Sequence, residues 1–170
     1  MYKIDQIINY GSKGICQITD IVTKQINDNN QTYYVLKPIY DASSTIYVPQ
    51  DNKDLTAKLC QIISKEEIFD VLDNMGTEFD LWSDNKNERE AMYRDILESG
   101  NQLEILKLIK TIYEKRVEKE LDNKKLHLFD ENIFKEAERR LYNEFGYVLN
   151  IEPENVLSFI KNYLEDNRSK

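Results

Sequence analysis

The chain has 170 residues, of which 41% are hydrophobic, enough for one ordinary core or two small ones. No segment reaches the apolar length of a membrane span, and residues 1–5 lack the apolar core of a secretion signal, so we expect a soluble, cytoplasmic protein without membrane contact. The net charge of −8 falls entirely on residues 64–170, which excludes a broad basic face and restricts any DNA contact to a local one.

The first 63 residues have the composition of short strands separated by turns. A β-branched segment and a second apolar segment flank a polar turn, which predicts a hairpin, and a further turn leads to an alternating strand. In chain order the expected elements are a strand at 15–22, a turn at 27–30, a strand at 32–39, a turn at 41–44 and a strand at 45–49. Short strands joined by short turns predict a small, strongly bent barrel.

Two glycines and two cysteines in this half have a structural interpretation. Gly11 and Gly14 predict a tight reversal, because a phosphate-binding loop would be followed by Lys-Ser/Thr and a helix. Cys16 and Cys60 lie in apolar surroundings without a neighbouring His or second Cys, so we expect buried thiols and neither a disulfide nor a metal site.

From Ser64 onward the hydrophobic period becomes helical, and several local signals mark the helix ends. Ser64 and Glu67 fit a capping box, Gly100 fits a C-cap, and Pro153 fits the first turn of a last helix. The expected helices begin at 65, at about 87, at 102, at about 129 and at 153. Residues 64–170 are therefore expected to form an all-α bundle.

Residues that would indicate catalysis are scarce. His127, the single histidine, precedes a helix, where a capping or partly buried role is expected. No serine lies in a nucleophile elbow, no cluster has metal-ligand spacing, and spacing alone does not separate catalytic carboxylates from exposed helix charges. The sequence predicts a non-enzymatic binding protein without a metal or other cofactor.

The single tryptophan, Trp82, lies in a polar segment between the two halves. It either packs with Phe79 and Leu81 against the helices, as partly buried tryptophans do, or stays available to a partner.

The order and spacing of several short segments resemble the CarD family of bacterial transcription regulators, whose first domain is shared with the transcription-repair coupling factor. The matching segments are 8–15 (INYGSKGI), 33–37 (YYVLK), 46–49 (IYVP), 63–67 (ISKEE), Trp82, 98–101 (ESGN) and the helical tail 103–164. The resemblance implies an α+β chain of two domains, a Tudor-like β-barrel at 1–63 that binds the RNA polymerase β subunit and a helical domain at 64–170 that contacts promoter DNA near the upstream edge of the melted region.

The resemblance also assigns candidate site residues. The family's polymerase-contacting arginines align with Lys24 and Tyr47, and Tyr34 is a third candidate, although strand alternation allows only one of Tyr33 and Tyr34 to face a partner.

For DNA, the family places a tryptophan as a minor-groove wedge at the position of Trp82. The family's dense arginine cluster is thinned after Trp82, which leaves as phosphate-contact candidates Lys86, Arg89, Arg94, Lys124 and Lys125. Each of them is alternatively an ordinary solvated charge.

These observations predict a monomeric regulator that binds polymerase and stabilises the open promoter complex, with a strand-exchanged dimer as the alternative assembly. The alternative function is a protein-protein adaptor that uses the barrel for polymerase and the acidic helices for another protein, without touching DNA.

Overall fold

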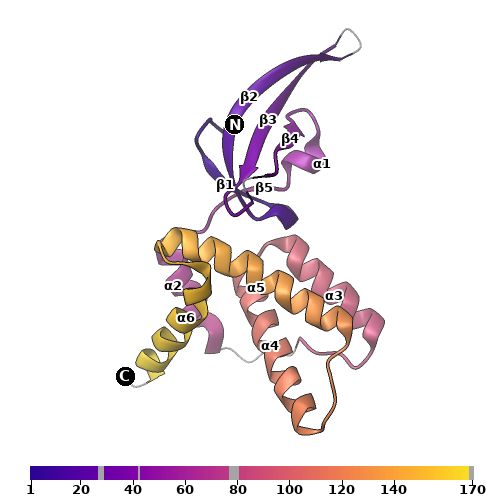
Figure 1. Cartoon of the computed structure of the whole chain (residues 1–170), viewed down its shortest axis with the longest axis vertical. Coiled ribbons are helices and arrows are strands. Elements are labelled where there is room, and N and C mark those ends of the chain that lie inside the picture. The colour runs from indigo at the N-terminus through magenta and orange to yellow at the C-terminus, as the bar shows by residue number, and fades with distance from the viewer. Residues whose placement is uncertain (27–28, 42, 77–80, 169–170) are drawn as a thin grey trace. The chain divides into compact units, whose positions relative to one another are not determined.

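The computed structural model describes residues 1–26, 29–41, 43–76 and 81–168. The chain divides into two compact units, Met1–Ile62 and Ile63–Lys170, the first built on a sheet and the second on helices (Figure 1). Each unit has its own hydrophobic core.

The first unit is a five-stranded antiparallel sheet with the order β4-β3-β2-β1-β5. Its strands are β1 (Ile7–Tyr10), β2 (Ile15–Ile26), β3 (Asn29–Pro38), β4 (Ile46–Pro49) and β5 (Leu59–Gln61). The predicted pairing of β2 with β3 is confirmed, and both strands extend further toward their connection than predicted (Figure 1). Residues 27 and 28 of the expected turn lie outside the described residues.

The sheet is open, so the expected Tudor-like barrel is not confirmed. Among the described residues β4 pairs with β3 and β5 pairs with β1, and the two outer strands do not pair with each other. A short 3₁₀ helix, η1 (Gly11–Lys13), makes the predicted reversal before β2, and both its first residue, Gly11, and the residue after it, Gly14, have positive φ. A short helix, α1 (Lys53–Thr56), precedes β5 and was not predicted.

Strand alternation gives the sheet one face in the core and one outside it. The core residues are Ile8, Cys16, Ile18, Tyr34, Leu36, Val48 and Leu59. A bulge at Thr19, which lies between the paired residues Ile18 and Asp20, shifts the register of β2 against β3. Cys16 is buried as expected, but the expectation is wrong for Cys60, because this residue of β5 is exposed.

The second unit contains α2 (Lys65–Asp73), the 3₁₀ turn η2 (Asn74–Gly76), α3 (Lys86–Ser99), α4 (Gln102–Leu121), α5 (Leu128–Leu149) and α6 (Pro153–Arg168). Every predicted start falls within one residue of an observed one, because α2 to α5 each begin at a side-chain cap and α6 begins at Pro153. Ser64 and Glu67 form the capping box, and Gly100 ends α3 with a φ of 68°.

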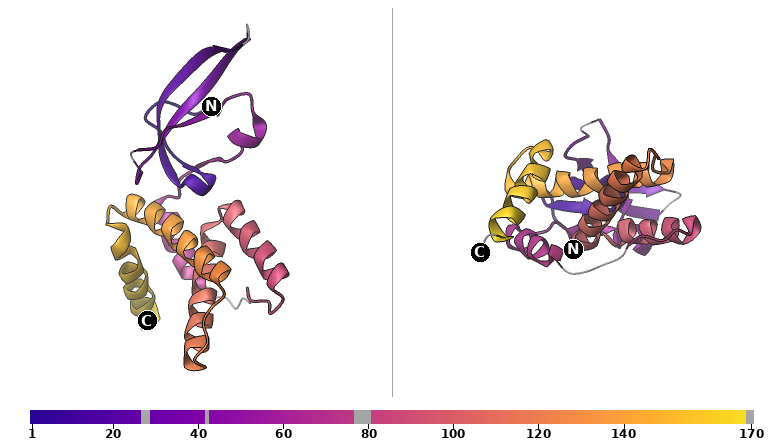
Figure 2. Two further views of the ribbon diagram at one scale, coloured as in Figure 1. Left: turned by 45° about the vertical axis from the view of Figure 1, so that its right-hand side comes forward. Right: turned by 90° about the horizontal axis from the view of Figure 1, so that it is seen from below.

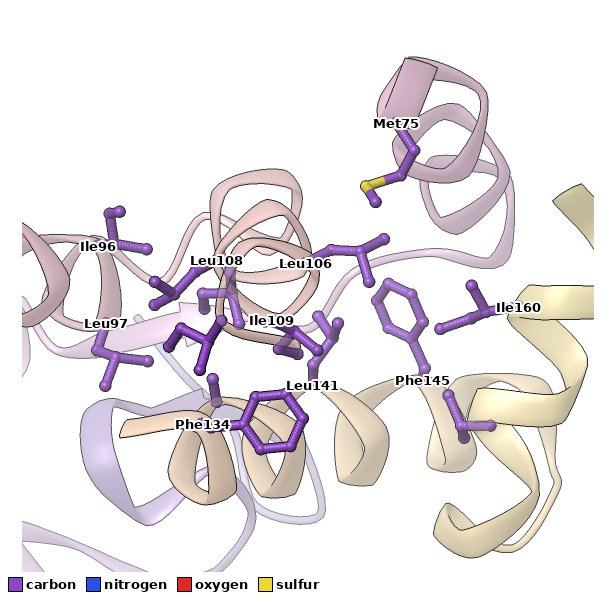
Figure 3. Close-up of a cluster of buried hydrophobic side chains, with 14 of the residues drawn as sticks. Met75, Ile96, Leu97, Leu106, Leu108, Ile109, Phe134, Leu141, Phe145 and Ile160 are labelled. Carbon is purple, nitrogen blue, oxygen red and sulfur yellow. The ribbon is translucent and has the colours of Figure 1, made fainter. Parts of the chain in front are cut away.

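The helices surround a single apolar core to which α5 contributes a long row of side chains. α5 packs against α4 and against α6, and Figure 2 shows it between them. Phe134, Leu141 and Phe145 of α5 meet Leu106 and Ile109 of α4 in this core (Figure 3). The buried carboxylate of Glu144 accepts hydrogen bonds from the amide of Ile63 at 3.1 Å and from Gln102 Nε2 at 3.2 Å, which ties the start of the unit to α4 and α5.

Candidate functional site

The first candidate site is a cluster of two tyrosines and a lysine on the outer face of the sheet. Lys24 Nζ of β2 lies 4.2 Å from the ring centroid of Tyr47 in β4, and that ring meets Tyr33 of β3 edge-on, with centroids 6.4 Å apart. Tyr47 is 48% exposed. The Tyr33 hydroxyl donates to Gln31 Oε1 at 2.8 Å, which fixes the ring at the surface. Lys24, Tyr33 and Tyr47 are called the outer-face cluster below.

Tyr34, which was a candidate for this surface, lies on the opposite face. It is 5% exposed, belongs to the core of the sheet and packs edge-on against Tyr2 with ring centroids 5.9 Å apart. Of the two tyrosines that strand alternation places on opposite faces, Tyr33 and not Tyr34 is therefore the candidate for a contact at the outer face. The deciding signal is the register, because Tyr33 pairs with Pro49 and thus lies diagonally beside Tyr47.

The second candidate site is built around Trp82. Its indole is partly buried and packs, with Leu81, against the core of the helical unit. The indole N–H donates to Asp84 Oδ1 at 3.0 Å. Phe79, the other expected packing partner, lies outside the described residues. Core packing and partial exposure thus occur together at this side chain.

Arg89, Lys115 and Lys119, all among the described residues, lie over the Trp82 ring. Arg89 of α3 has its guanidinium carbon 4.4 Å from the centroid, while Lys115 and Lys119 of α4 have their ammonium nitrogens at 5.6 and 5.9 Å. The two lysines were missed in the sequence. Their spacing does predict that Lys115 and Lys119 share one face of a helix, because residues four apart do so. Nothing in the sequence indicates that this face lies beside Trp82.

Arg89 is not the exposed phosphate contact that was expected. Its side chain is 7% exposed and that of Asp130, in the first turn of α5, is 1% exposed. Arg89 Nε and Nη2 donate to the two Asp130 oxygens at 2.9 and 3.0 Å, and Nη1 donates to the Ser83 carbonyl at 2.6 Å. The hydrogen bonds that Arg89 donates to Asp130 raise the pKa of the guanidinium, which is therefore a permanently charged internal group.

The other predicted phosphate contacts remain at the surface. Lys86 and Arg94, with side chains 52% and 63% exposed, both pair with Glu90 on α3, at 3.5 and 3.6 Å. Lys124 pairs with Asp122 at 3.6 Å, and Lys125 is exposed. These cations are spread over α3 and the α4–α5 connection, each accessible to solvent.

The described residues hold little that would support catalysis. His127 caps α5, with Nδ1 accepting from the Phe129 amide at 3.2 Å, which confirms the predicted capping role. Burial raises the pKa of Glu138, and this carboxyl lines an apolar groove of about 160 Å³ together with Phe134, Tyr142 and Ile160. Within the described ranges no group of three or more His, Cys, Asp or Glu is arranged to hold a metal ion, and no helix there is long and apolar enough to cross a membrane.

Comparison with known proteins finds a similarity in the first unit. The sequence model of a family described as CarD-like/TRCF RID domain matches residues 2–63, a range that coincides with the sheet unit and includes the outer-face cluster. No curated protein matches the chain.

Proposed function

We propose that this protein, whose residues 2–63 form a CarD-like RNA polymerase-interacting domain, is a transcription regulator that binds the polymerase β subunit and stabilises the open promoter complex through Trp82. That domain is a non-enzymatic interaction module, so the proposal assigns no catalytic step to the chain. The helical unit supplies the DNA contact, which is local because the net charge of residues 64–170 is negative.

The outer-face cluster is the proposed contact with the β subunit. Aromatic side chains presented at a surface are the usual anchors of protein interfaces, and Tyr47 is the more exposed of the two tyrosines in this cluster. Lys24 adds a single positive charge beside the rings, in a geometry that favours an acidic group on the partner.

The observation that carries the DNA contact is a partly exposed indole flanked by Lys115 and Lys119. An aromatic wedge inserted at a distorted step replaces lost base stacking, and unstacking costs a few kcal/mol. Two lysines beside the wedge supply cations for the phosphates next to the insertion point, so the contact does not need a broad basic face. Lys86, Arg94, Lys124 and Lys125 remain outer candidates.

The mechanism is a population shift. Polymerase bound to the outer-face cluster holds the protein near the promoter, and this high local concentration makes a weak contact sufficient. A wedge that fits melted DNA better than closed DNA then biases the equilibrium toward the open complex. At promoters where escape is slow, the same bias represses.

The test is the lifetime of open complexes on a cognate promoter, with purified polymerase and the full-length protein. The protein should prolong the lifetime, and Trp82→Ala should lose about a tenfold effect or more, since 1.4 kcal/mol is tenfold and the wedge offsets a few kcal/mol. Tyr113→Ala, which removes a 51% exposed aromatic ring from α4, is the matched control and should retain the effect. An unchanged lifetime with Trp82→Ala would reject the wedge.

Polymerase binding has its own test, a titration of the full-length protein against the isolated β subunit. Trp82→Ala should bind as the wild type does, because Trp82 and the outer-face cluster belong to different units. No binding at tens of micromolar, about the range in which weak transient interfaces still register, would contradict the polymerase contact itself.

The second candidate is the protein-protein adaptor, and one observation favours it. Tyr113, Val117 and Leu121 lie four residues apart along α4 and are 51%, 40% and 81% exposed, which gives this helix an apolar strip outside the core. An adaptor would leave open-complex lifetime unchanged in the purified system while binding polymerase normally. The two assays above therefore separate the candidates.

A further inference from the structure

Arg89 joins three parts of the helical unit at one point. Its guanidinium makes a bidentate pair of hydrogen bonds with the Asp130 carboxylate of α5, donates to the carbonyl oxygen of Ser83 and lies against the ring of Trp82. Ser83, in the segment that leads into α3, is thus connected to the start of α5 through a single side chain. Because the bidentate pair is planar and both partners are almost fully buried, the guanidinium has one orientation.

The segment that follows Trp82 is fixed independently at its other end. The indole N–H bonds to Asp84, Ser83 Oγ donates to Glu88 Oε2 at 3.0 Å, and Asn85 caps α3 by accepting from the amides of residues 87 and 88. These bonds tie the backbone of residues 83–85 to the first turn of α3. The bond to Asp84 holds one edge of the indole, whereas the tilt of the ring about that bond depends on what packs against its face. Arg89 is nearer to the ring centroid than Lys115 or Lys119.

We propose that Asp130, acting through Arg89, is a positioning residue for Trp82: this carboxylate orients the guanidinium, and the guanidinium holds the indole ready for its partner. The proposal rests on the function given above, in which Trp82 is the wedge. A side chain ordered before binding loses less conformational freedom on insertion, so Asp130 strengthens the DNA contact without touching DNA.

The alternative role for the pair is structural only, a buried ion pair that joins α3 to α5. Removing one partner of such a pair leaves an uncompensated buried charge and destabilises a protein strongly, whereas replacing both partners by apolar residues of similar volume is often neutral or stabilising. The double variant Arg89→Met with Asp130→Leu therefore restores stability while removing the contact that orients the indole.

Fluorescence gives a direct readout, because Trp82 is the only tryptophan in the chain. The variants are Asp130→Asn, the double variant, and Asp122→Asn as the control, which neutralises a carboxylate 65% exposed and paired with Lys124. Acrylamide quenching of Trp82 in the folded full-length proteins should rise by about twofold in Asp130→Asn and in the double variant, because the released side chain visits more exposed rotamers. The control should match the wild type.

The double variant decides between the two roles even if Asp130→Asn does not fold. Quenching equal to the wild type in a stable double variant would overturn the positioning role, since a purely structural pair has been replaced there by apolar packing. Raised quenching together with an open-complex lifetime shortened toward that of Trp82→Ala supports it. If Trp82→Ala itself leaves the lifetime unchanged, the wedge fails, while the quenching result still decides whether Asp130 orients the indole.

Discussion

Tyr34 and Tyr47 lie on opposite faces of the sheet, and replacing each should separate folding from binding. Tyr34 is 5% exposed and packs against Tyr2, whereas Tyr47 is 48% exposed and its ring contacts Tyr33 and Lys24 of the outer-face cluster. Tyr34→Ala should therefore cost about 3–5 kcal/mol of stability, the range for truncating a buried aromatic residue. Tyr47→Ala should cost about 1 kcal/mol, from the lost aromatic and cation contacts at an exposed position.

Urea unfolding followed by circular dichroism measures the two costs. With a denaturant slope of about 1–3 kcal/mol per molar, Tyr34→Ala should lower the midpoint of the sheet unit by about 1 M or more, while Tyr47→Ala shifts it by less than about 1 M. Trp82 fluorescence, which reports on the helical unit, should be unaffected by either change.

Binding to the β subunit should follow the reverse order. Tyr47→Ala removes the central anchor and should weaken binding by about thirtyfold, corresponding to a 2 kcal/mol hot spot. Tyr34→Phe, which keeps the buried ring, is the control and should bind as the wild type. If Tyr47→Ala is the more destabilising of the two alanine variants, or if it binds β normally, the assignment of faces and partners is wrong.

Three further predictions concern one glycine and the two cysteines. Gly146→Ala should destabilise the helical unit by about 1–3 kcal/mol in thermal unfolding, because a Cβ there would lie 2.9 Å from the Ile151 carbonyl oxygen and 3.3 Å from Pro153 N. Gly76→Ala is the control and should be tolerated, because a Cβ at Gly76 would have no atom within 4 Å. Equal melting temperatures for the two variants would contradict the prediction. In the native protein iodoacetamide should label exposed Cys60 and spare Cys16, whose pKa burial raises to about 11, and mass mapping of the labelled peptides checks it. Since an unfolded thiol deprotonates near its ordinary value of 9.0, stability should fall as pH rises from about 9 to 11, and Cys16→Ala should lose that part of the slope.

Much of the helical unit could be predicted because its signals are short-range. The capping box at Ser64 and Glu67, the positive φ of Gly100 and the cap by His127 each involve residues within a few positions of one another, so the sequence contains the whole interaction. The pairing of β2 with β3 was predictable for the same reason, since the two strands are adjacent in sequence.

The candidate sites were predicted only in part. The sequence and its family resemblance selected Trp82, Lys24 and Tyr47, and the structure places the last two in direct contact. Among the described residues Lys86 and Arg94 share the carboxylate of Glu90, whereas Lys124 pairs with Asp122 on the α4–α5 connection. These ion pairs do not gather the four predicted phosphate contacts, Lys86, Arg94, Lys124 and Lys125, into one cluster.

By itself the sequence determined the long helices α2 to α6, the strands β2, β3 and β4, and that the negative charge belongs to the second half, whereas it did not show β1, β5 or the short helix α1. Only the tertiary structure decided that Tyr33 and not Tyr34 faces outward, that the sheet stays open, that Arg89 is internal and that Lys115 and Lys119 flank Trp82. The physical reason is distance along the chain. Arg89 and Asp130 are 41 positions apart, and a charge that pairs across that separation looks in the sequence like any solvated arginine.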